Sequence, residues 1–371
     1  MERSSLITIL GAGAAGIGVA VALKRLGMDQ FQVIDKGKIG QSFRHWNKYT
    51  RFITPSFNTS GFGFPDLNAI TPNTSPGMSA GKEHLSGPEY ASYLEEVAAY
   101  FDVTVHTQEE IIGIQKTDEG FKLWSKDNQY YSKYLILAVG DLSFPNTRNL
   151  KGAEHGVLYA DLGDYSRLGE ASEYAIIGGN ESGFDAAIQL AKQGKRSVMY
   201  ARHASLDSES SDPSLGLSLY TRERYHAVKD RIRIVRGVRM NEILVTDEGF
   251  QLVSEQGERY ATQAAPIVAT GFAATQSPLI NNLFEVEGNR AVLTGLDEST
   301  LHSNLFMVGP QVEHGQVVLC FIYKFRQRFA VIIDEIASRE GLELRESAIQ
   351  DYLDNQMYLT DLDSCGTDCV C

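Results

Sequence analysis

The chain has little cysteine, no long apolar run and a shortage of positive charge. Only four of its 371 residues are cysteines, which excludes a framework stapled by many disulfides. No stretch approaches the length of a transmembrane helix. The formal net charge of -13 argues against nonspecific binding to nucleic acid or to an anionic membrane.

What is present is typical of a globular protein. Hydrophobic residues make up 43% of the chain, and its length predicts two or three domains. The N-terminus enters an apolar segment directly, without a signal-peptide core, so we expect a cytoplasmic protein. No zinc-hydrolase, Ser-His-Asp or P-loop pattern stands out.

A glycine-rich turn follows the first apolar segment. Residues 6–10 have the composition of a buried parallel strand, and directly after them comes Gly11-Ala12-Gly13-Ala14-Ala15-Gly16. A helical apolar pattern begins at Ile17. The first glycine permits the tight turn, the second lets a pyrophosphate approach, and the third lets helix and strand pack closely. The phosphates would then lie on free N–H groups at the helix N-terminus.

An acidic residue completes this first motif. The next strand-like segment, 31–35, ends in Asp35, and Lys36 follows it. A carboxylate roughly 20 residues after the turn suits a ribose 2′-hydroxyl. The sequence therefore predicts a dinucleotide site here, against the alternative of a glycine-rich turn without a ligand.

A second turn lies about half the chain further on. The apolar segment 174–177 leads into Gly178-Gly179-Asn180-Glu181-Ser182-Gly183, where Asn180 replaces the middle glycine and is expected to tolerate left-handed backbone. The strand after it ends without an acid, and Arg202 occupies the matching place. An arginine would hold a 2′-phosphate, which predicts a preference for NADPH. The alternative is that Arg202 is an ordinary solvated residue.

Further motifs between and after these turns carry a resemblance to a family. They are Gly40-Gln41-Ser42-Phe43-Arg44-His45-Trp46, Thr54-Pro55-Ser56, Phe64-Pro65-Asp66 and Ala269-Thr270-Gly271-Phe272. With the two turns, they make nearly the whole chain resemble the flavoproteins with two dinucleotide-binding domains, and within them the flavin-containing monooxygenase-like group. The chain is similar to small bacterial monooxygenase-like proteins associated with zinc and cobalt efflux systems.

The resemblance implies an α/β fold with two Rossmann-like dinucleotide-binding domains, the NADPH domain being inserted in a discontinuous FAD domain. The FAD domain would comprise 1–165 and 271–360, the NADPH domain 166–270, and a cysteine-rich tail 361–371. Within this frame a long irregular stretch, 37–87, is expected to be functional. A long helix is expected at 315–339, where Lys324, Arg326 and Arg328 would touch FAD phosphates or form a solvated face.

The resemblance also assigns residues to the cofactors. The isoalloxazine side would be lined by Gly40, Ser42, Phe43 and Trp46. The residues Gly140 and Asp141 would lie near the FAD phosphates or the domain hinge, Gly309 would approach the flavin from the last strand, and Thr270 with Gly271 would complete the cofactor-binding set. Two residues are candidates for catalysis: Asn58, in oxygen chemistry, and His45, in positioning the flavin or moving a proton.

The chain departs from the family patterns in three places. In 150–159, where monooxygenases carry a fingerprint histidine, Tyr159 or a displaced His155 takes its place. Disulfide reductases of this fold usually have an aspartate where Pro310 follows Gly309. Ala15 stands where the similar bacillithiol disulfide reductase-like proteins have a cysteine.

Three of the four cysteines, Cys365, Cys369 and Cys371, lie in the last seven residues. They could form a mobile dithiol shuttle, or bind a soft metal ion such as Zn(II) or Cu(I). The alternative is a terminus with incidental cysteines. The remaining Cys320 lies among apolar residues and is expected to be buried.

Three functions follow as hypotheses. The first is an FAD-dependent oxidoreductase reduced by NADPH that oxygenates a soft sulfur or nitrogen nucleophile through a flavin hydroperoxide, so that its partners are a small molecule and O2. The second is an NADPH-dependent thiol-disulfide or metal-linked reductase that uses the cysteine tail. The third is a metal-carrying accessory protein. No nucleic-acid or membrane partner is expected, and the oligomeric state is open.

Overall fold

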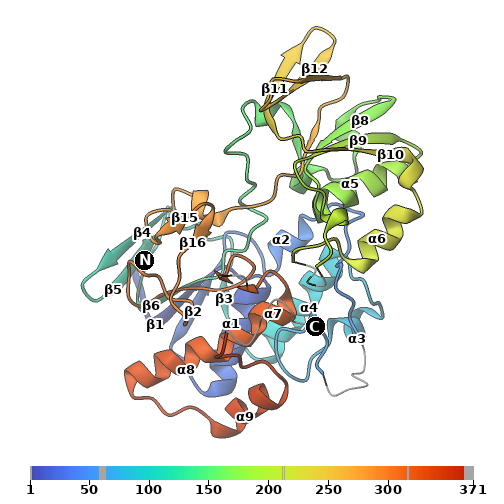
Figure 1. Ribbon diagram of the computed structural model, residues 1–371. Coiled ribbons are helices and arrows are strands. Elements are labelled where there is room, and N and C mark those ends of the chain that lie inside the picture. The colour runs from blue at the N-terminus through green and yellow to red at the C-terminus, as the bar shows by residue number, and fades with distance from the viewer. Residues whose placement is uncertain (1, 58–63, 211, 213, 316, 363–371) are drawn as a thin grey trace. The chain divides into compact units, whose positions relative to one another are not determined.

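The computed structural model describes residues 2–57, 64–210, 212, 214–315 and 317–362, which form two compact units. Unit 1 takes Met1–Arg44, Thr54–Phe144 and the described chain from Ala273 on, and unit 2 takes His45–Ile53 and Pro145–Phe272 (Figure 1). The observed boundary at 145 precedes the expected one at 166, and the segment 45–53 joins unit 2 instead of its flanking sequence. Side-chain hydrogen bonds from Thr50 to Tyr159 and Asp185 account for that assignment.

Unit 1 is built on a seven-stranded sheet with the order β3-β2-β1-β6-β5-β4, in which β17 also pairs with β6. The strands β3, β2, β1, β6 and β17 are parallel, and β4 and β5 form an antiparallel hairpin beside β6. Their bounds are β1 Glu2–Leu10, β2 Phe31–Ile34, β3 Val105–His106, β4 Gly113–Thr117, β5 Gly120–Trp124, β6 Gln129–Leu137 and β17 Leu305–Met307.

The helices of unit 1 pack around α1 (Ala14–Leu26), which contacts α4 (Gly87–Tyr100), α8 (Phe329–Glu340) and α9 (Glu346–Asp354). A Cβ on Gly18 would lie 2.1 Å from the ring of Phe329, so a glycine is required where α1 crosses α8. The helix α4 begins with a capping box in which Ser86 and Glu89 satisfy each other's backbone N–H groups. The core of this unit is therefore formed by helices laid on a largely parallel sheet.

The prediction of one long helix at 315–339 is wrong. A short hairpin of β18 (Glu313–His314) and β19 (Val317–Val318) comes first, followed by α7 (Ile322–Phe325), a single 3₁₀ turn (Arg326–Arg328) and α8. Arg326 donates to the carbonyls of Asp66 and Ala69, and Arg328 donates to Asp297 at 2.8 Å. Both guanidinium groups are buried and bound to protein, so neither a solvated face nor free phosphate ligands form there.

Unit 2 contains a five-stranded parallel sheet with the order β10-β9-β8-β14-β7. Its strands are β7 Val157–Leu158, β8 Glu173–Ile177, β9 Arg196–Ala201, β10 Ile232–Arg236 and β14 Ile267–Val268. One face packs against α5 (Glu181–Lys192), and α6 (Leu219–His226) contacts α5 in turn. The opposite face is covered by an antiparallel sheet of β11 (Met240–Thr246), β12 (Gly249–Ser254) and β13 (Arg259–Thr262).

The stretch 37–87 is irregular, as expected, apart from the short helices α2 (Gln41–Arg44) and α3 (Pro76–Ala80) among its described residues. The expected α/β architecture with two dinucleotide-type sheets is confirmed, since each unit has a strand–turn–helix at its centre. Among the described residues, no helix is long and apolar enough to cross a bilayer.

Candidate cofactor site

The first glycine turn has a backbone that only glycine can adopt. Gly11 lies at φ +114°, and a Cβ there would come within 2.3 Å of the carbonyl oxygen of Ala138. A Cβ on Gly16 would lie 1.9 Å from the carbonyl oxygen of Gly11. Two of the three glycines are therefore required by the packing of β1, α1 and the end of β6 against one another.

The middle glycine of this turn, Gly13, faces open space. Nothing lies within 4 Å of a Cβ placed on Gly13, which is the N-cap of α1 and makes no side-chain capping bond. No acidic residue stands in the first turn of α1, so the N–H groups there combine with the helix dipole to favour an anion. This part of the turn fits a pyrophosphate, because space and unsatisfied donors occur together.

Asp35 joins the turn to the loop after β2. Its Oδ2 accepts a hydrogen bond from the N–H of Ala12 at 2.7 Å, and its Oδ1 accepts one from the N–H of Gly37 at 2.6 Å. A carboxylate has about four acceptor positions, so two remain for the hydroxyls of a ribose. Gly40 is fixed to the same turn, because its N–H donates to the carbonyl of Ala12 at 2.9 Å.

Two further segments reach the first turn at the carboxyl ends of β6 and β17. The N–H of Ala138 donates to Leu10, and a Cβ on Gly309, at φ +103°, would lie 3.2 Å from the methyl group of Ala15. Gly140, at φ +66°, has nothing within 4 Å of a Cβ position. Carboxyl ends of parallel strands are where ligands bind in open α/β sheets. The structure therefore brings the predicted residues of 11–16, 140 and 309 to one edge of the sheet.

Asp141, which follows Gly140, has an unusual acidity for an aspartate. Burial raises the pKa of its carboxyl to about 6, against a smaller lowering by the N–H groups of Asp141 and Leu142. No cation compensates this carboxylate among the causes of its shift. A carboxyl that is partly protonated near neutral pH can approach a phosphate with less repulsion than an ordinary aspartate.

The second glycine turn reproduces the first almost contact for contact. Gly178 lies at φ +125°, with a Cβ position 2.1 Å from the carbonyl oxygen of Ala269, and a Cβ on Gly183 would lie 2.3 Å from the carbonyl oxygen of Gly178. The motif at 269–272 therefore does for unit 2 what residues 138–141 do for unit 1. Thr270 donates its hydroxyl to the carbonyl of Asn146 at 2.6 Å, and Gly271 leaves open space at φ +82°.

The expectation that Asn180 adopts left-handed backbone is wrong. Asn180 has φ -109° and ψ -170°, an extended conformation, and Gly13 in the first turn has φ -85° and ψ -164°. Neither residue needs left-handed backbone, so asparagine replaces glycine here without conformational strain. The difference between them is the side chain, which extends the exposed rim of the second turn.

The strand register corrects the position matched to Asp35. Gly11 donates its N–H to Ile34, and Gly178 donates its N–H to Tyr200. The residue after each acceptor is Asp35 in unit 1 and Ala201 in unit 2. Arg202 therefore lies one residue beyond the matching place, where it is exposed and makes no hydrogen bond or ion pair among the described residues.

Glu181, at the first position of α5, is turned away from the helix N-terminus. Its Oε1 accepts from the N–H of Ser218 at 2.5 Å, and its Oε2 accepts from the hydroxyl of Thr221 at 2.7 Å. These bonds cap α6 with the carboxylate. The predicted contact of Glu181 with a cofactor would therefore involve its backbone, as it would for the neighbouring Ser182.

The loop residues predicted at the flavin are divided between the units. Ser42 and Phe43 lie in α2 of unit 1, where the ring of Phe43 packs edge-on against Tyr90 with centroids 4.8 Å apart. His45 is exposed in unit 2, and there Trp46 packs against Phe52 at 4.8 Å. Asn58 lies outside the described residues.

A buried polar network in unit 2 was not foreseen. The carboxylate of Asp185 accepts from Arg224 at 2.6 Å and from the hydroxyl of Tyr159 at 2.9 Å, and Thr50 lies 3.3 Å from it. Burial and the charge of Asp185 raise the pKa of the Tyr159 hydroxyl well above its usual range. Tyr159, which occupies the region of the monooxygenase fingerprint, thus holds the segment 45–53 to α5. His155, the alternative, is exposed beside Glu154.

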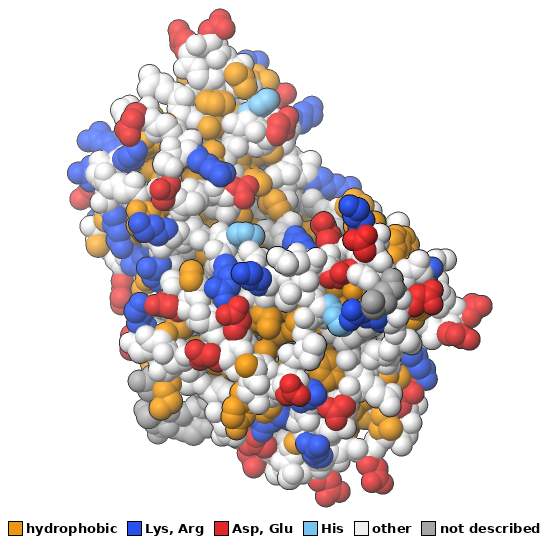
Figure 2. Space-filling model, turned by 180° about the vertical axis from the view of Figure 1, so that it is seen from behind, with side chains coloured by type: hydrophobic (Ala, Val, Ile, Leu, Met, Phe, Trp, Pro, Cys, Tyr) orange, Lys and Arg blue, Asp and Glu red, His pale blue; other side chains and the backbone are white. Residues whose placement is uncertain are grey.

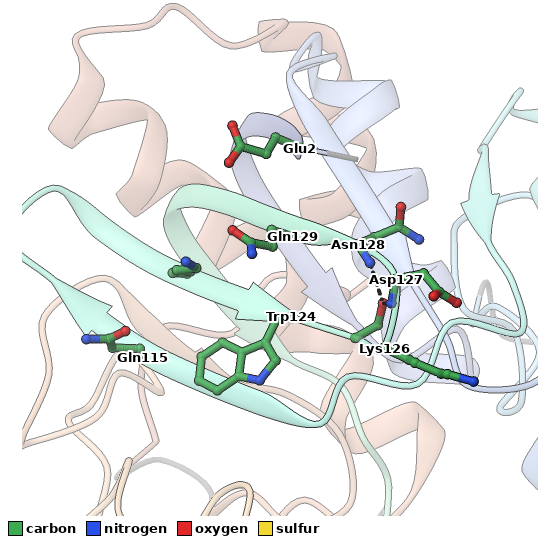
Figure 3. Close-up of a pocket in the computed structure, with 9 residues that line it drawn as sticks. Glu2, Gln115, Trp124, Lys126, Asp127, Asn128 and Gln129 are labelled. Atoms are coloured by element: carbon green, nitrogen blue, oxygen red, sulfur yellow. Dashed lines mark hydrogen bonds between the residues drawn. The ribbon is translucent and has the colours of Figure 1, made fainter.

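Unit 1 also contains a hollow that is separate from the glycine turns. A hollow of about 630 Å³ is lined by Glu2, by β4, β5 and the start of β6, and by the turn 125–128 (Figure 3). It shares no lining residue with the glycine turns. The cofactor residues are therefore identified by backbone geometry and not by cavity size.

The three tail cysteines lie outside the described residues. Within the part of the chain that the structure describes, no group of three or more His, Cys, Asp and Glu side chains could hold a metal ion. Cys320, expected to be buried, is half-buried. It lies in an irregular segment between β19 and α7, which explains its partial exposure.

Two Rossmann-type turns, one with an aspartate and one without, define the class of flavoproteins with two dinucleotide-binding domains. The chain belongs to the pyridine nucleotide-disulphide oxidoreductase family, whose model matches residues 8–309. It is accordingly an FAD-dependent oxidoreductase that uses a pyridine nucleotide.

The chain is similar to an uncharacterized oxidoreductase, to a flavin monooxygenase and to a disulfide reductase. The uncharacterized oxidoreductase CzcO of Bacillus velezensis is 25% identical over 277 residues, which cover 64% of this chain and 76% of CzcO. A mutant flavin monooxygenase from Stenotrophomonas maltophilia has a TM-score of 0.71 at 16% identity, covering 91% of this chain and 99% of its own. The bacillithiol disulfide reductase Bdr of Bacillus cereus has a TM-score of 0.70 at 21% identity, covering 91% and 100%. The last two show a shared fold.

Proposed function

We propose that the protein is an NADPH-dependent flavin monooxygenase-type enzyme that oxygenates a soft sulfur or nitrogen nucleophile. In this proposal the first turn holds FAD through Gly13, the first N–H groups of α1 and Asp35. The second turn holds NADPH, with Arg202 on its 2′-phosphate. Bound FAD would supply the redox chemistry, and the protein would bind and orient both dinucleotides and exclude water.

The observation that carries this proposal is Ala15. A flavoprotein that reduces disulfides needs a thiol near its flavin, and the resemblance places such a cysteine at this position in the first turn. Here the side chain at position 15 is a buried methyl group, which would lie 3.2 Å from a Cβ placed on Gly309. Outside the last seven residues the sequence has only Cys320, so neither unit can form a dithiol of its own.

The oxygenation test supplies NADPH, ¹⁸O₂ and a thioether probe, thioanisole, to the FAD-loaded protein. We expect one ¹⁸O atom in the sulfoxide product, with one NADPH consumed for each. The matched variant is a chain that ends at Ser364 and so lacks the three tail cysteines, and its product yield should be unchanged.

The competing function is a thiol-disulfide or metal-linked reductase, favoured by the fold shared with Bdr and by the cysteine tail. It predicts NADPH oxidation without oxygen when a disulfide such as cystine is supplied, and loss of that activity in the chain ending at Ser364. Rapid anaerobic disulfide reduction with no ¹⁸O in thioanisole would contradict oxygenation. If only metal binding were lost on truncation, an accessory role would be favoured.

A further inference from the structure

A second hollow lies wholly within unit 2 and has a basic lining. Its volume is about 420 Å³, and its walls come from α5, from α6 and from the segment 45–53. Three of the seven lining residues are cations, and none is acidic; the lining residues are Tyr49, Arg51, Gln189, Lys192, Gln193, Tyr220 and Arg224.

The hollow lies away from the nucleotide turn of the same unit. The glycine turn opens at the N-terminus of α5, whereas Gln189 and Lys192 are in its last turns. Lys192 comes nine residues after Gly183, which places it about 13 Å further along the helix at 1.5 Å per residue. A ligand in the hollow would therefore not occupy the phosphate site at the other end of α5.

The charges of the hollow are not balanced by the protein. One cation, Arg224, pairs with the buried carboxylate of Asp185 at 2.6 Å, yet its Nε is buried without a hydrogen-bond partner. Among the described residues, Arg51 donates only to the carbonyls of Lys48 and Thr50, and Lys192 has no ion pair with any of them. After Asp185 is counted, the site keeps a surplus of two positive charges.

This surplus affects the Lys192 amine. Partial burial lowers the pKa of Lys192, the charges of Arg224 and Arg51 lower it further, and Asp185 opposes them. A single lysine in the last turn would be enough to complement the dipole of α5. The helix dipole does not explain why Arg51, from a different part of the chain, faces the same hollow. Two cations in excess at one hollow are explained by an anionic ligand.

The remaining walls suit an organic ligand. The guanidinium of Arg224 lies 4.8 Å from the ring centroid of Tyr220, and Tyr49 supplies a second ring that is braced by Tyr165 at 6.1 Å. Gln189 and Gln193 add amide donors and acceptors one helical turn apart. The hollow thus combines cations with aromatic rings and amides.

We infer that this basic hollow binds a small organic acid through a carboxylate or phosphate oxyanion held by Arg51, Lys192 and Arg224. The oxyanion would lie against Arg51 and Lys192, beside the guanidinium of Arg224, and the tyrosine rings would face the carbon skeleton. None of the residues that line the hollow belongs to the two glycine turns.

The test is isothermal titration of the FAD-loaded protein with two probes, citrate and inorganic pyrophosphate, at constant ionic strength and with saturating NADP⁺ present. Binding of either probe is expected, and the stronger probe identifies carboxylate or phosphate as the ligand chemistry. The variants Lys192→Gln and Arg51→Gln should each weaken that binding at least tenfold. The matched control is Lys229→Gln, an exposed lysine of unit 2 outside the hollow, and it should bind like the parent.

Three results would overturn the inference. They are the absence of binding by both probes, equal weakening in the control, and unchanged binding in both hollow variants when melting temperatures show that each is folded. The variant Arg202→Gln separates this site from the nucleotide site: it should lose NADPH affinity and keep probe binding. A loss of probe binding in that variant would assign the anion to the nucleotide turn.

Discussion

The two glycine turns have nearly the same backbone and differ in the groups around it. In both turns a Cβ on the first glycine would clash with a backbone carbonyl oxygen. The distance between these two atoms would be 2.3 Å in unit 1 and 2.1 Å in unit 2. Only the first turn is closed by a carboxylate, since Asp35 is replaced by Ala201 in the register of the second. The backbone contacts are therefore common to the two turns, and the carboxylate beside the first turn distinguishes it from the second.

The units also differ in charge. The described residues of unit 2 contain as many Lys and Arg as Asp and Glu, so the net charge of -13 belongs to the rest of the chain. Figure 2 shows Lys and Arg side chains gathered at the upper left, the side on which β9 and β10 lie in that view. A neutral unit with basic patches suits the more highly charged of the two dinucleotides, NADPH.

The largest expected effect comes from the glycines of the first turn. Gly11→Ala adds a Cβ against backbone and forces a left-handed residue, so we expect loss of FAD and a fall of several kcal/mol in the free energy of unfolding. Gly13→Ala meets no protein atom within 4 Å, so it should fold and still lose FAD. For each variant, flavin absorbance measures the bound FAD and the melting temperature measures the stability. Equal stability of the two variants would contradict the distinction.

Arg202→Ala, just after β9, should weaken NADPH binding by about 10- to 100-fold, because roughly one or two charge-assisted hydrogen bonds to the 2′-phosphate would be lost. NADH binding should be nearly unchanged. The measurement is the rate of flavin reduction against the concentration of each nucleotide. Arg196→Ala, at the amino end of the same strand, is the matched control, and a similar loss in that variant would count against a 2′-phosphate role.

Ala201→Asp converts the second turn toward the first. By analogy with Asp35, the new carboxylate would accept the N–H of Gly179 and repel a 2′-phosphate. We expect about a tenfold loss of NADPH affinity, together with a gain for NADH. The same reduction assay measures it, with the melting temperature as a check on folding. An unchanged ratio of the two nucleotides would show that the register argument is wrong.

The smallest effect concerns Asp141. Its pKa of about 6 exceeds the value of 3.8 of an unfolded aspartate, so the folded protein binds its proton more tightly. The stabilisation from that proton is present at low pH and is lost as pH rises toward 6. Asp141→Asn should therefore raise the free energy of unfolding by about 1–2 kcal/mol at pH 7 and by little at pH 4. A gain that is the same at both pH values would contradict this assignment.

The sequence predicted most reliably what is local. Strand, glycine turn and helix follow one another within some 20 residues, and the structure has both turns where their patterns place them. The network around Asp185 could not be foreseen, because Thr50, Tyr159 and Arg224 are far apart in the chain. The prediction of a helix at 315–339 failed for a related reason. Arg326 and Arg328 bind carbonyl and carboxylate groups that are distant in the chain, and no local pattern reveals such contacts.

The central claim is that electrons enter from NADPH at the second turn and leave to oxygen without a thiol. The direct measurement is to reduce the FAD-loaded protein with NADPH under anaerobic conditions, and then to mix it with either oxygen or cystine while recording the flavin spectrum. We expect rapid reoxidation by oxygen, none by cystine, and the same rates in the chain ending at Ser364. Rapid reoxidation by cystine that disappears on truncation would contradict it.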